Sequence, residues 1–111
     1  MASEVTKLPQ VGIATPADIA AWKEAHGEAY GYKTLYDGKE HWTYCRVPKL
    51  TDIDYANSVG TESTTKFTQA LYDSVYLGGS EFAKTDDRIK QGVFKKILKL
   101  CKAIEAEEVK L

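Results

Sequence analysis

The sequence predicts an α+β domain with one N-terminal helix, a two-stranded β-hairpin, and then three helices, the last of them long and amphipathic. Three observations carry this prediction: an Asp37-Gly38 turn between two aromatic runs, capping residues before apolar stretches, and an apolar stripe near the C-terminus. A chain of 111 residues suits one domain. We expect residues 15–111 to form it. Residues 1–14, which contain a proline and a glycine as breakers, are expected to be a flexible segment.

The first helix is expected to start after Thr15, whose hydroxyl can cap it. Pro16 suits the first helical position, and Asp18 places a carboxylate in the first turn. Gly27 is a suitable residue to end the helix because glycine adopts the left-handed conformation without strain. Trp22 can then lay an aromatic ring against the rest of the domain.

The hairpin is expected within the stretch YGYKTLYDGKEHWTYCRVP. Asp37-Gly38 is typical of a two-residue type I′ turn, which needs positive φ at both positions. Tyrosine, tryptophan and threonine alternate on each side of the turn, as on a half-buried pleated surface. An isolated hairpin is only marginally stable in water. This one is therefore expected to pack on helices or to extend a sheet in another copy of the chain.

Two helices are expected after the hairpin. Thr51 and Asp52 predict the start of a short helix that ends near Gly60. The next helix is expected from about Ser63 and to end before the Gly78-Gly79 pair, because apolar residues recur at helical spacing between these points. These residues are Phe67, Ala70, Leu71 and Val75.

The last helix is expected to follow Thr85 as its cap, with two aspartates in its first turn. Its apolar stripe is wider than a strict coiled-coil seam, and most of it must pack inside the domain. The helix is nevertheless long for so small a domain, so its exposed edge is the best candidate for a partner surface. The predicted partner-binding residues are Ile97, Leu100, Ile104 and Leu111 of the C-terminal region, with Trp42 and Tyr44 of the hairpin.

The stretch LGGSEFAKTDD at residues 77–87 raises the question of a ligand site. It lacks the glycine-lysine spacing of a phosphate-binding P-loop. Asp86 and Asp87 are adjacent, so on a helix their side chains point about 100° apart and are poorly placed to share a metal ion. Helix punctuation explains the residues better, with Gly78 or Gly79 ending one helix and Thr85 capping the next.

Charge and cysteine content exclude several classes of protein. The chain has 15 basic and 16 acidic residues, which gives no basic excess for binding nucleic acid. Tyr32, Trp42 and Tyr44 could stack on bases, but core packing is the favoured interpretation of these rings. Cys45 and Cys101 are isolated, as expected of a reduced cytoplasmic protein. No signal peptide or membrane span is expected.

No catalytic, cofactor-binding or metal-binding residue is predicted. His41 and Cys45 are four residues apart on a strand, which separates them by roughly 13 Å at about 3.3 Å per residue and forbids direct proton transfer. The histidines lack neighbours at metal-ligand spacing, and no serine lies in a nucleophile elbow. We therefore expect a protein that is not an enzyme.

Four stretches resemble small proteins encoded by phages and prophages of Bacteroidetes, which are similar to tail assembly chaperones. The resemblance covers about residues 15–111, and Tyr76 departs from it at a position where a tryptophan is expected. The stretches are TPADIAAWKEAHG, DGKEHWTYCRVPKLTDIDYA, LYDSVYLGGSEFAKTDDRI and IEAEEVKL.

This resemblance implies a non-enzymatic assembly factor that binds an aggregation-prone tail tape-measure protein, or a tail-tube protein, in the cytoplasm of the host cell. Weak homo-oligomerisation would suit that role. One alternative is a minor structural component of the particle, such as a head-tail connector protein. Another is a generic protein-interaction module. A small enzyme or nucleotide-binding protein is disfavoured because the motifs for those activities are missing.

Overall fold

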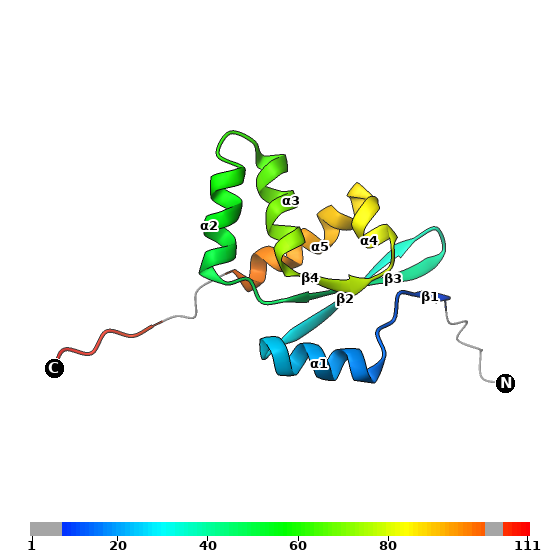
Figure 1. Ribbon diagram of the computed structural model, residues 1–111, viewed down its shortest axis with the longest axis horizontal. Helices are drawn as coiled ribbons and strands as arrows, with labels where there is room; N and C mark the ends of the chain where they lie inside the picture. The colour runs from blue at the N-terminus through cyan, green and yellow to red at the C-terminus, as the bar shows by residue number, and fades with distance from the viewer. Residues whose placement is uncertain (1–7, 102–105) are drawn as a thin grey trace.

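The computed structural model describes residues 8–101 and 106–111, and the fold is α+β as predicted (Figure 1). The hairpin, the N-terminal helix and the long amphipathic helix are all present, together with two short strands and a short helix. In chain order the elements are β1 (Gln10–Val11), α1 (Pro16–His26), β2 (Ala29–Tyr36), β3 (Lys39–Arg46), α2 (Leu50–Val59), α3 (Thr64–Val75), β4 (Tyr76–Gly79), α4 (Phe82–Thr85) and α5 (Asp87–Leu100).

Strand β3 is the centre of the sheet. It pairs antiparallel with β2 along one side, from Tyr36 opposite Lys39 to Ala29 opposite Arg46. On its other side, β1 pairs in parallel with the start of β3, and β4 pairs antiparallel with its later part. The turn between β2 and β3 has positive φ at both central residues, which confirms the type I′ hairpin.

The two faces of the sheet differ in what covers them (Figure 1). We call the side toward α3, α4 and α5 the core face and the side toward α1 the aromatic face. On the core face, Cys45 of β3 packs with buried apolar residues of the helices. These residues are Leu71, Tyr72 and Val75 of α3, Ala83 of α4, and Ile89, Val93 and Ile97 of α5. Helix α2 packs on α3 and adds Ala56 to the same core.

The aromatic face is a layer of rings beneath α1. Trp22 of α1 lies 5.3 Å from the ring of Tyr44, and Trp42 stacks on Tyr44 at 5.7 Å with an interplanar angle of 9°. Tyr44 is buried, and its hydroxyl accepts a hydrogen bond from the Ala14 backbone N–H at 3.1 Å. No residue of α1 itself is fully buried, so this helix is held mainly by aromatic contact.

Arg46 ties the end of β3 to two helices. Its guanidinium donates two hydrogen bonds to the Asp52 carboxylate of α2, at 2.7 and 2.9 Å, and one to the Ser74 carbonyl of α3 at 2.8 Å. Asp52 also accepts from the Lys49 backbone N–H at 2.7 Å. The bonds from Arg46 lower the pKa of Asp52, because they favour its charged form.

The predicted punctuation at residues 77–87 is wrong in two details. Gly78 and Gly79 do not end a helix: α3 ends at Val75, and both glycines belong to β4, where pairing with β3 overrides the local signal. The cap of the long helix is Asp86, whose carboxylate accepts from the backbone N–H groups of Arg88 and Ile89. Thr85 instead ends the short helix α4.

Two further boundaries differ from the prediction. Helix α2 begins at Leu50 rather than after Thr51, and the Asp52 carboxylate rather than a hydroxyl binds the free N–H at its start. Residues 10–11, in the segment predicted to be flexible, form β1 and pair with β3. Pairing with the distant strand β3 holds residues 10–11 in place, and the local sequence does not predict that pairing.

Candidate functional site

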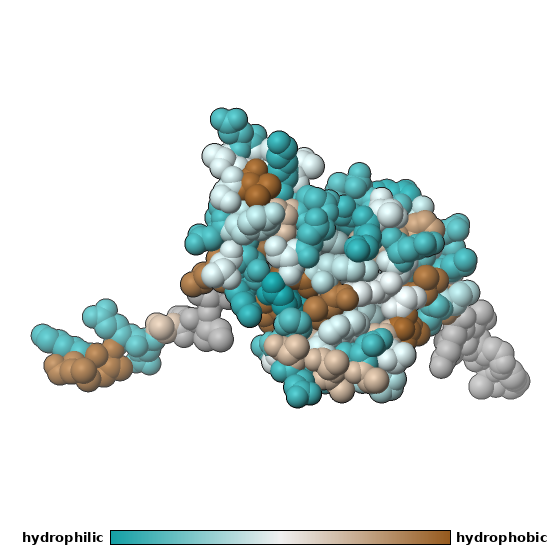
Figure 2. All heavy atoms as spheres, viewed as in Figure 1, coloured by the Kyte–Doolittle hydropathy of each residue, from teal (hydrophilic) through white to brown (hydrophobic). Residues whose placement is uncertain are grey.

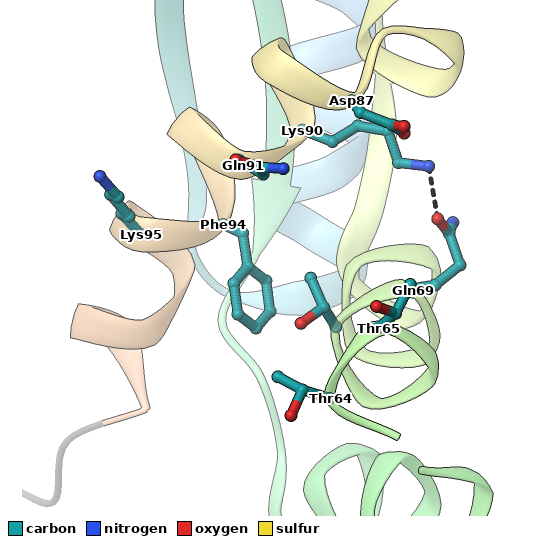
Figure 3. Close-up of a pocket in the computed structure, with 9 residues that line it drawn as sticks. Thr64, Thr65, Gln69, Asp87, Lys90, Gln91, Phe94 and Lys95 are labelled. Atoms are coloured by element: carbon teal, nitrogen blue, oxygen red, sulfur yellow. Dashed lines mark hydrogen bonds between the residues drawn. The ribbon is translucent and has the colours of Figure 1, made fainter.

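A groove of about 470 Å³ lies between α3 and α5 (Figure 3). Phe94 of α5 points into it toward Thr64 and Thr65 of α3, and Thr68 completes the same wall. Lys95 points away from the groove at its outer rim. The groove therefore has one large aromatic residue at its floor and short side chains opposite.

The sequence of α3 explains why the two helices do not close on one another. Its buried stripe of alanine, leucine, tyrosine and valine faces the core, but the threonines of its first turns face α5. Threonine is too short to fill the space that Phe94 leaves beside it. At the far end, the Lys90 ammonium donates to the Gln69 side-chain oxygen and lies 5.8 Å from the centre of the Tyr72 ring, which joins the helices there (Figure 3).

The composition of the groove suits an apolar side chain of a protein partner. Phe94 and the threonine methyl groups offer apolar surface, while Asp87, Lys90 and Gln91 place polar groups at the rim. The lining residues include no histidine or cysteine and a single carboxylate. Within the described ranges, no three histidine, cysteine or acidic side chains gather in a way that could hold a metal ion.

A buried histidine–serine pair was missed by the sequence analysis. His41 Nδ1 lies 2.8 Å from Ser80 Oγ, although the two residues are 39 positions apart. Both are about 1 % exposed, and Ser80 Oγ also accepts from the Phe82 backbone N–H. The pair forms because β4 delivers Ser80 beside β3. No local sequence motif predicts that meeting.

This pair does not have the arrangement of a hydrolase nucleophile. In a serine hydrolase the serine contacts Nε2, and a carboxylate holds the other ring nitrogen. Here Ser80 contacts Nδ1, and Nε2 has no hydrogen-bond partner among the described residues. The rings of Tyr36 and Phe82 lie 5.6 and 5.4 Å from the imidazole of His41, and both contact it edge-on. The contacts are those of a packed aromatic cluster.

The predicted partner-binding residues do not form one surface. Ile97 is fully buried in the core, and Tyr44 is buried beneath α1. Trp42 and Leu100 are half-buried, and Leu111 is fully exposed. Ile104 lies outside the described residues. Of the six, only Leu111 therefore presents its whole side chain to solvent in the part of the chain that is described.

Other apolar side chains are exposed instead. Leu35 of β2, Leu50 and Tyr55 of α2, and Leu98 of α5 are between 44 and 83 % exposed. On the face shown in Figure 2, hydrophobic side chains are scattered among hydrophilic ones and do not make one large patch. The spacing of apolar residues in the sequence predicted neither the α3–α5 groove nor the exposure of Leu35. Both depend on how neighbouring elements pack, because each arises where a neighbour leaves a side chain uncovered.

Over the residues that the structure describes, no helix combines the length and apolarity needed to cross a bilayer. Comparisons of the chain with protein-family models, with curated proteins and with solved structures find no match.

Proposed function

We propose that this protein binds another protein during assembly of a phage-type tail, as the resemblance to tail assembly chaperones implies. Its partner would be the tape-measure protein, a long chain that aggregates when its apolar surface is exposed. The observation that supports this proposal is the α3–α5 groove, with Phe94 at its floor and a polar rim. A groove of this kind suits an apolar anchor from an amphipathic helix of the partner.

The lining residues suggest how such a helix would dock. One apolar side chain of the partner would cover Phe94 and lie between the methyl groups of Thr64 and Thr65. Polar residues beside that anchor would meet Lys95 and Gln91 at the rim. Binding of this kind needs only a few anchors and a wet rim, so it can be reversible, as a chaperone requires.

Co-expression with a tape-measure protein from the same genome tests the proposal. We expect the wild-type protein to raise the soluble fraction of that partner and to be co-purified with it. The variant Thr65→Arg places a long charged side chain in the groove at an exposed position and should abolish both effects. Thr51→Arg, also exposed but outside this groove, is the matched control and should behave as the wild type.

Two outcomes would contradict the proposal. One is a tape-measure protein whose solubility does not change when the wild type is present. The other is full activity of the Thr65→Arg variant after its fold has been verified by circular dichroism. Purified particles separate a chaperone from a structural component, because a chaperone should be absent from them and a connector protein should be present.

A further inference from the structure

Among the residues that the structure describes, no strand pairs with the outer edge of β2. β2 ends the sheet and pairs only with β3, along its whole length of eight residues. Within residues 8–101 and 106–111, no other element forms a backbone hydrogen bond with β2. A long open edge is a template for adding another strand, and proteins usually protect such edges.

The register shows which backbone groups are free on this edge. The Glu40 N–H donates to the Pro9 carbonyl, and the Trp42 carbonyl accepts from the Ser80 N–H, so both residues of β3 turn their backbone groups away from β2. Residues directly opposite them in the antiparallel pair turn theirs outward as well. The free groups of β2 therefore belong to Ala29, Gly31, Lys33 and Leu35.

The usual protection of an edge strand is missing here. Lys33 is the only charged residue of β2, and its ammonium lies 3.5 Å from the Glu40 carboxylate and 5.8 Å from the centre of the Trp42 ring. Its charge is thus turned back over its own sheet and does not guard the edge. Leu35 is 68 % exposed beside it. An incoming strand gains an apolar contact at Leu35, and the nearest charge of β2 is already paired with Glu40.

A second groove, of about 350 Å³, lies where this edge meets α5. Residues 31–34 of β2 form one side, and Gly92, Val93 and Lys96 of α5 form the other. Gly92 is inside a helix, where glycine is less stable than alanine, and a Cβ at this position would meet no atom within 4 Å. Packing within the described chain gives no reason for a glycine here. Close approach of another molecule along the β2 edge does.

We propose that the β2 edge binds the β2 edge of a second copy of this chain, antiparallel, with the two-fold axis at Tyr32. In this register Leu35 of one copy faces Ala29 of the other, and Lys33 faces Gly31. All the outward backbone groups are then paired, in about eight hydrogen bonds at two for each facing pair. The side chains of Tyr30, Tyr32 and Thr34 from the added strand lie on the groove side, where Gly92 leaves room for them.

The sequence of β2 favours this register over one of its two nearest alternatives, the one with the axis at Lys33. A two-fold axis at Lys33 would place the two lysines directly opposite one another, and like charges at facing positions destabilise a strand pair. That register would also leave Ala29 facing the hairpin turn of the other copy, so fewer hydrogen bonds would form. The axis at Tyr32 avoids both losses.

Sedimentation velocity over a wide concentration range tests the proposal, with Lys33→Pro as the decisive variant. Proline removes the outward N–H of residue 33, which takes no part in the bonds between β2 and β3. We expect the wild type to dimerise. Lys33→Pro should associate at least about tenfold more weakly, since two hydrogen bonds are lost by symmetry. Lys33→Ala is the matched control and should dimerise as the wild type does.

Hydrogen exchange provides a second readout. The amides of Gly31, Lys33 and Leu35 should become protected as protein concentration rises, while those of Tyr32 and Thr34 should be protected at every concentration. The variant Gly92→Leu should weaken association while its monomer remains folded, so it decides the question if Lys33→Pro does not fold.

Three results would overturn the dimer. They are a wild type that stays monomeric at millimolar concentration, a Lys33→Ala variant as impaired as Lys33→Pro, and unchanged association in both Lys33→Pro and Gly92→Leu. The chain is tested alone in all of these experiments. Failure of the dimer is therefore distinct from failure of the tape-measure interaction.

Discussion

The two faces of the sheet are built in different ways. On the core face, three residues of α5 and four of α3 are buried, and the aliphatic side chains among them interdigitate with Cys45. On the aromatic face, α1 buries none of its residues fully and rests on Tyr44 through Trp22. One face is close-packed, and the other is a stack of rings open at its rim.

The helices therefore contribute unequally to stability. Removing a buried aliphatic side chain leaves a cavity in a close-packed region, and neighbouring groups relax only partly. Around Trp22, which is only partly buried, the helix can shift and water can enter. We expect α5 to unfold only with the whole domain, while α1 opens locally at lower free energy.

The largest effect is expected for Ile97→Ala on the core face. Ile97 is 0 % exposed, so the truncation should lower the free energy of unfolding by about 3–4 kcal/mol. Urea denaturation followed by circular dichroism measures this loss. Trp22→Ala on the aromatic face should cost less, about 2–3 kcal/mol, because part of its ring stays in water and α1 can move toward the sheet.

Native-state hydrogen exchange adds a test of where that loss occurs. In Trp22→Ala, the amides of α1 should lose protection while those of α5 keep theirs. An equal loss in both helices would show that the two faces form one cooperative unit, which would contradict the comparison.

The adjacent glycines of β4 should differ in how well they tolerate a side chain, because one faces the β3 backbone and the other the Trp22 ring. Gly79 has φ 137°, and a Cβ there would overlap the Trp42 carbonyl oxygen, so Gly79→Ala should lower the free energy of unfolding by about 3 kcal/mol. At Gly78 a Cβ would meet the Trp22 ring at 3.2 Å, and that ring can move. Gly78→Ala should therefore cost about 1 kcal/mol or less. Thermal melts of both variants check this order, and equal losses would show that the Trp22 ring cannot move away from a Cβ at Gly78.

Loss of the Arg46–Asp52 pair should have a smaller effect that depends on pH. Both side chains are 14 % exposed, and Asp52→Asn should cost about 2 kcal/mol at neutral pH. Because the pKa of Asp52 is lowered in the folded state, its contribution is fully present above the ordinary carboxylate pKa of about 3.9 and is lost as pH falls through the folded value.

Urea denaturation at pH 7 and at pH 3 and below checks the sign of this dependence. The gap in stability between the wild type and Asp52→Asn should narrow on acidification. The exposed Asp54→Asn on the same helix controls for a change in net charge and should lie close to the wild type at both pH values. If the difference in stability between the wild type and Asp52→Asn widened as pH falls, the stabilising role of the charged Asp52 carboxylate would be refuted.

Local signals predicted the elements that local chemistry determines. Helix α1 begins after Thr15, with Pro16 first, and ends at Gly27 as expected. The side-chain hydroxyl of Thr15 accepts from the Asp18 N–H. The Asp37-Gly38 turn set the register of the hairpin. These features depend on backbone preferences within a few residues, and so a single sequence is enough to reveal them.

Long-range pairing accounts for what was missed. β1 and β4 are two and four residues long, and each exists because β3 offers it an edge. The Gly78-Gly79 pair therefore looks like the end of a helix in the sequence, although it lies in a strand. The α3–α5 groove could not be predicted either, because it reflects a mismatch in size between threonines and Phe94 across two helices.

The central position of β3 has a consequence for the order of folding. The hairpin closes through a two-residue turn, an event of microseconds, whereas β4 can dock only after the intervening chain with α2 and α3 has been gathered. A nascent chain that ends before Tyr76 has the hairpin but no β4, so the later part of β3 is open on that side. We expect such truncated translation products to aggregate through that edge. The full-length chain should not aggregate in this way once residues 76–79 have been made and cover the edge.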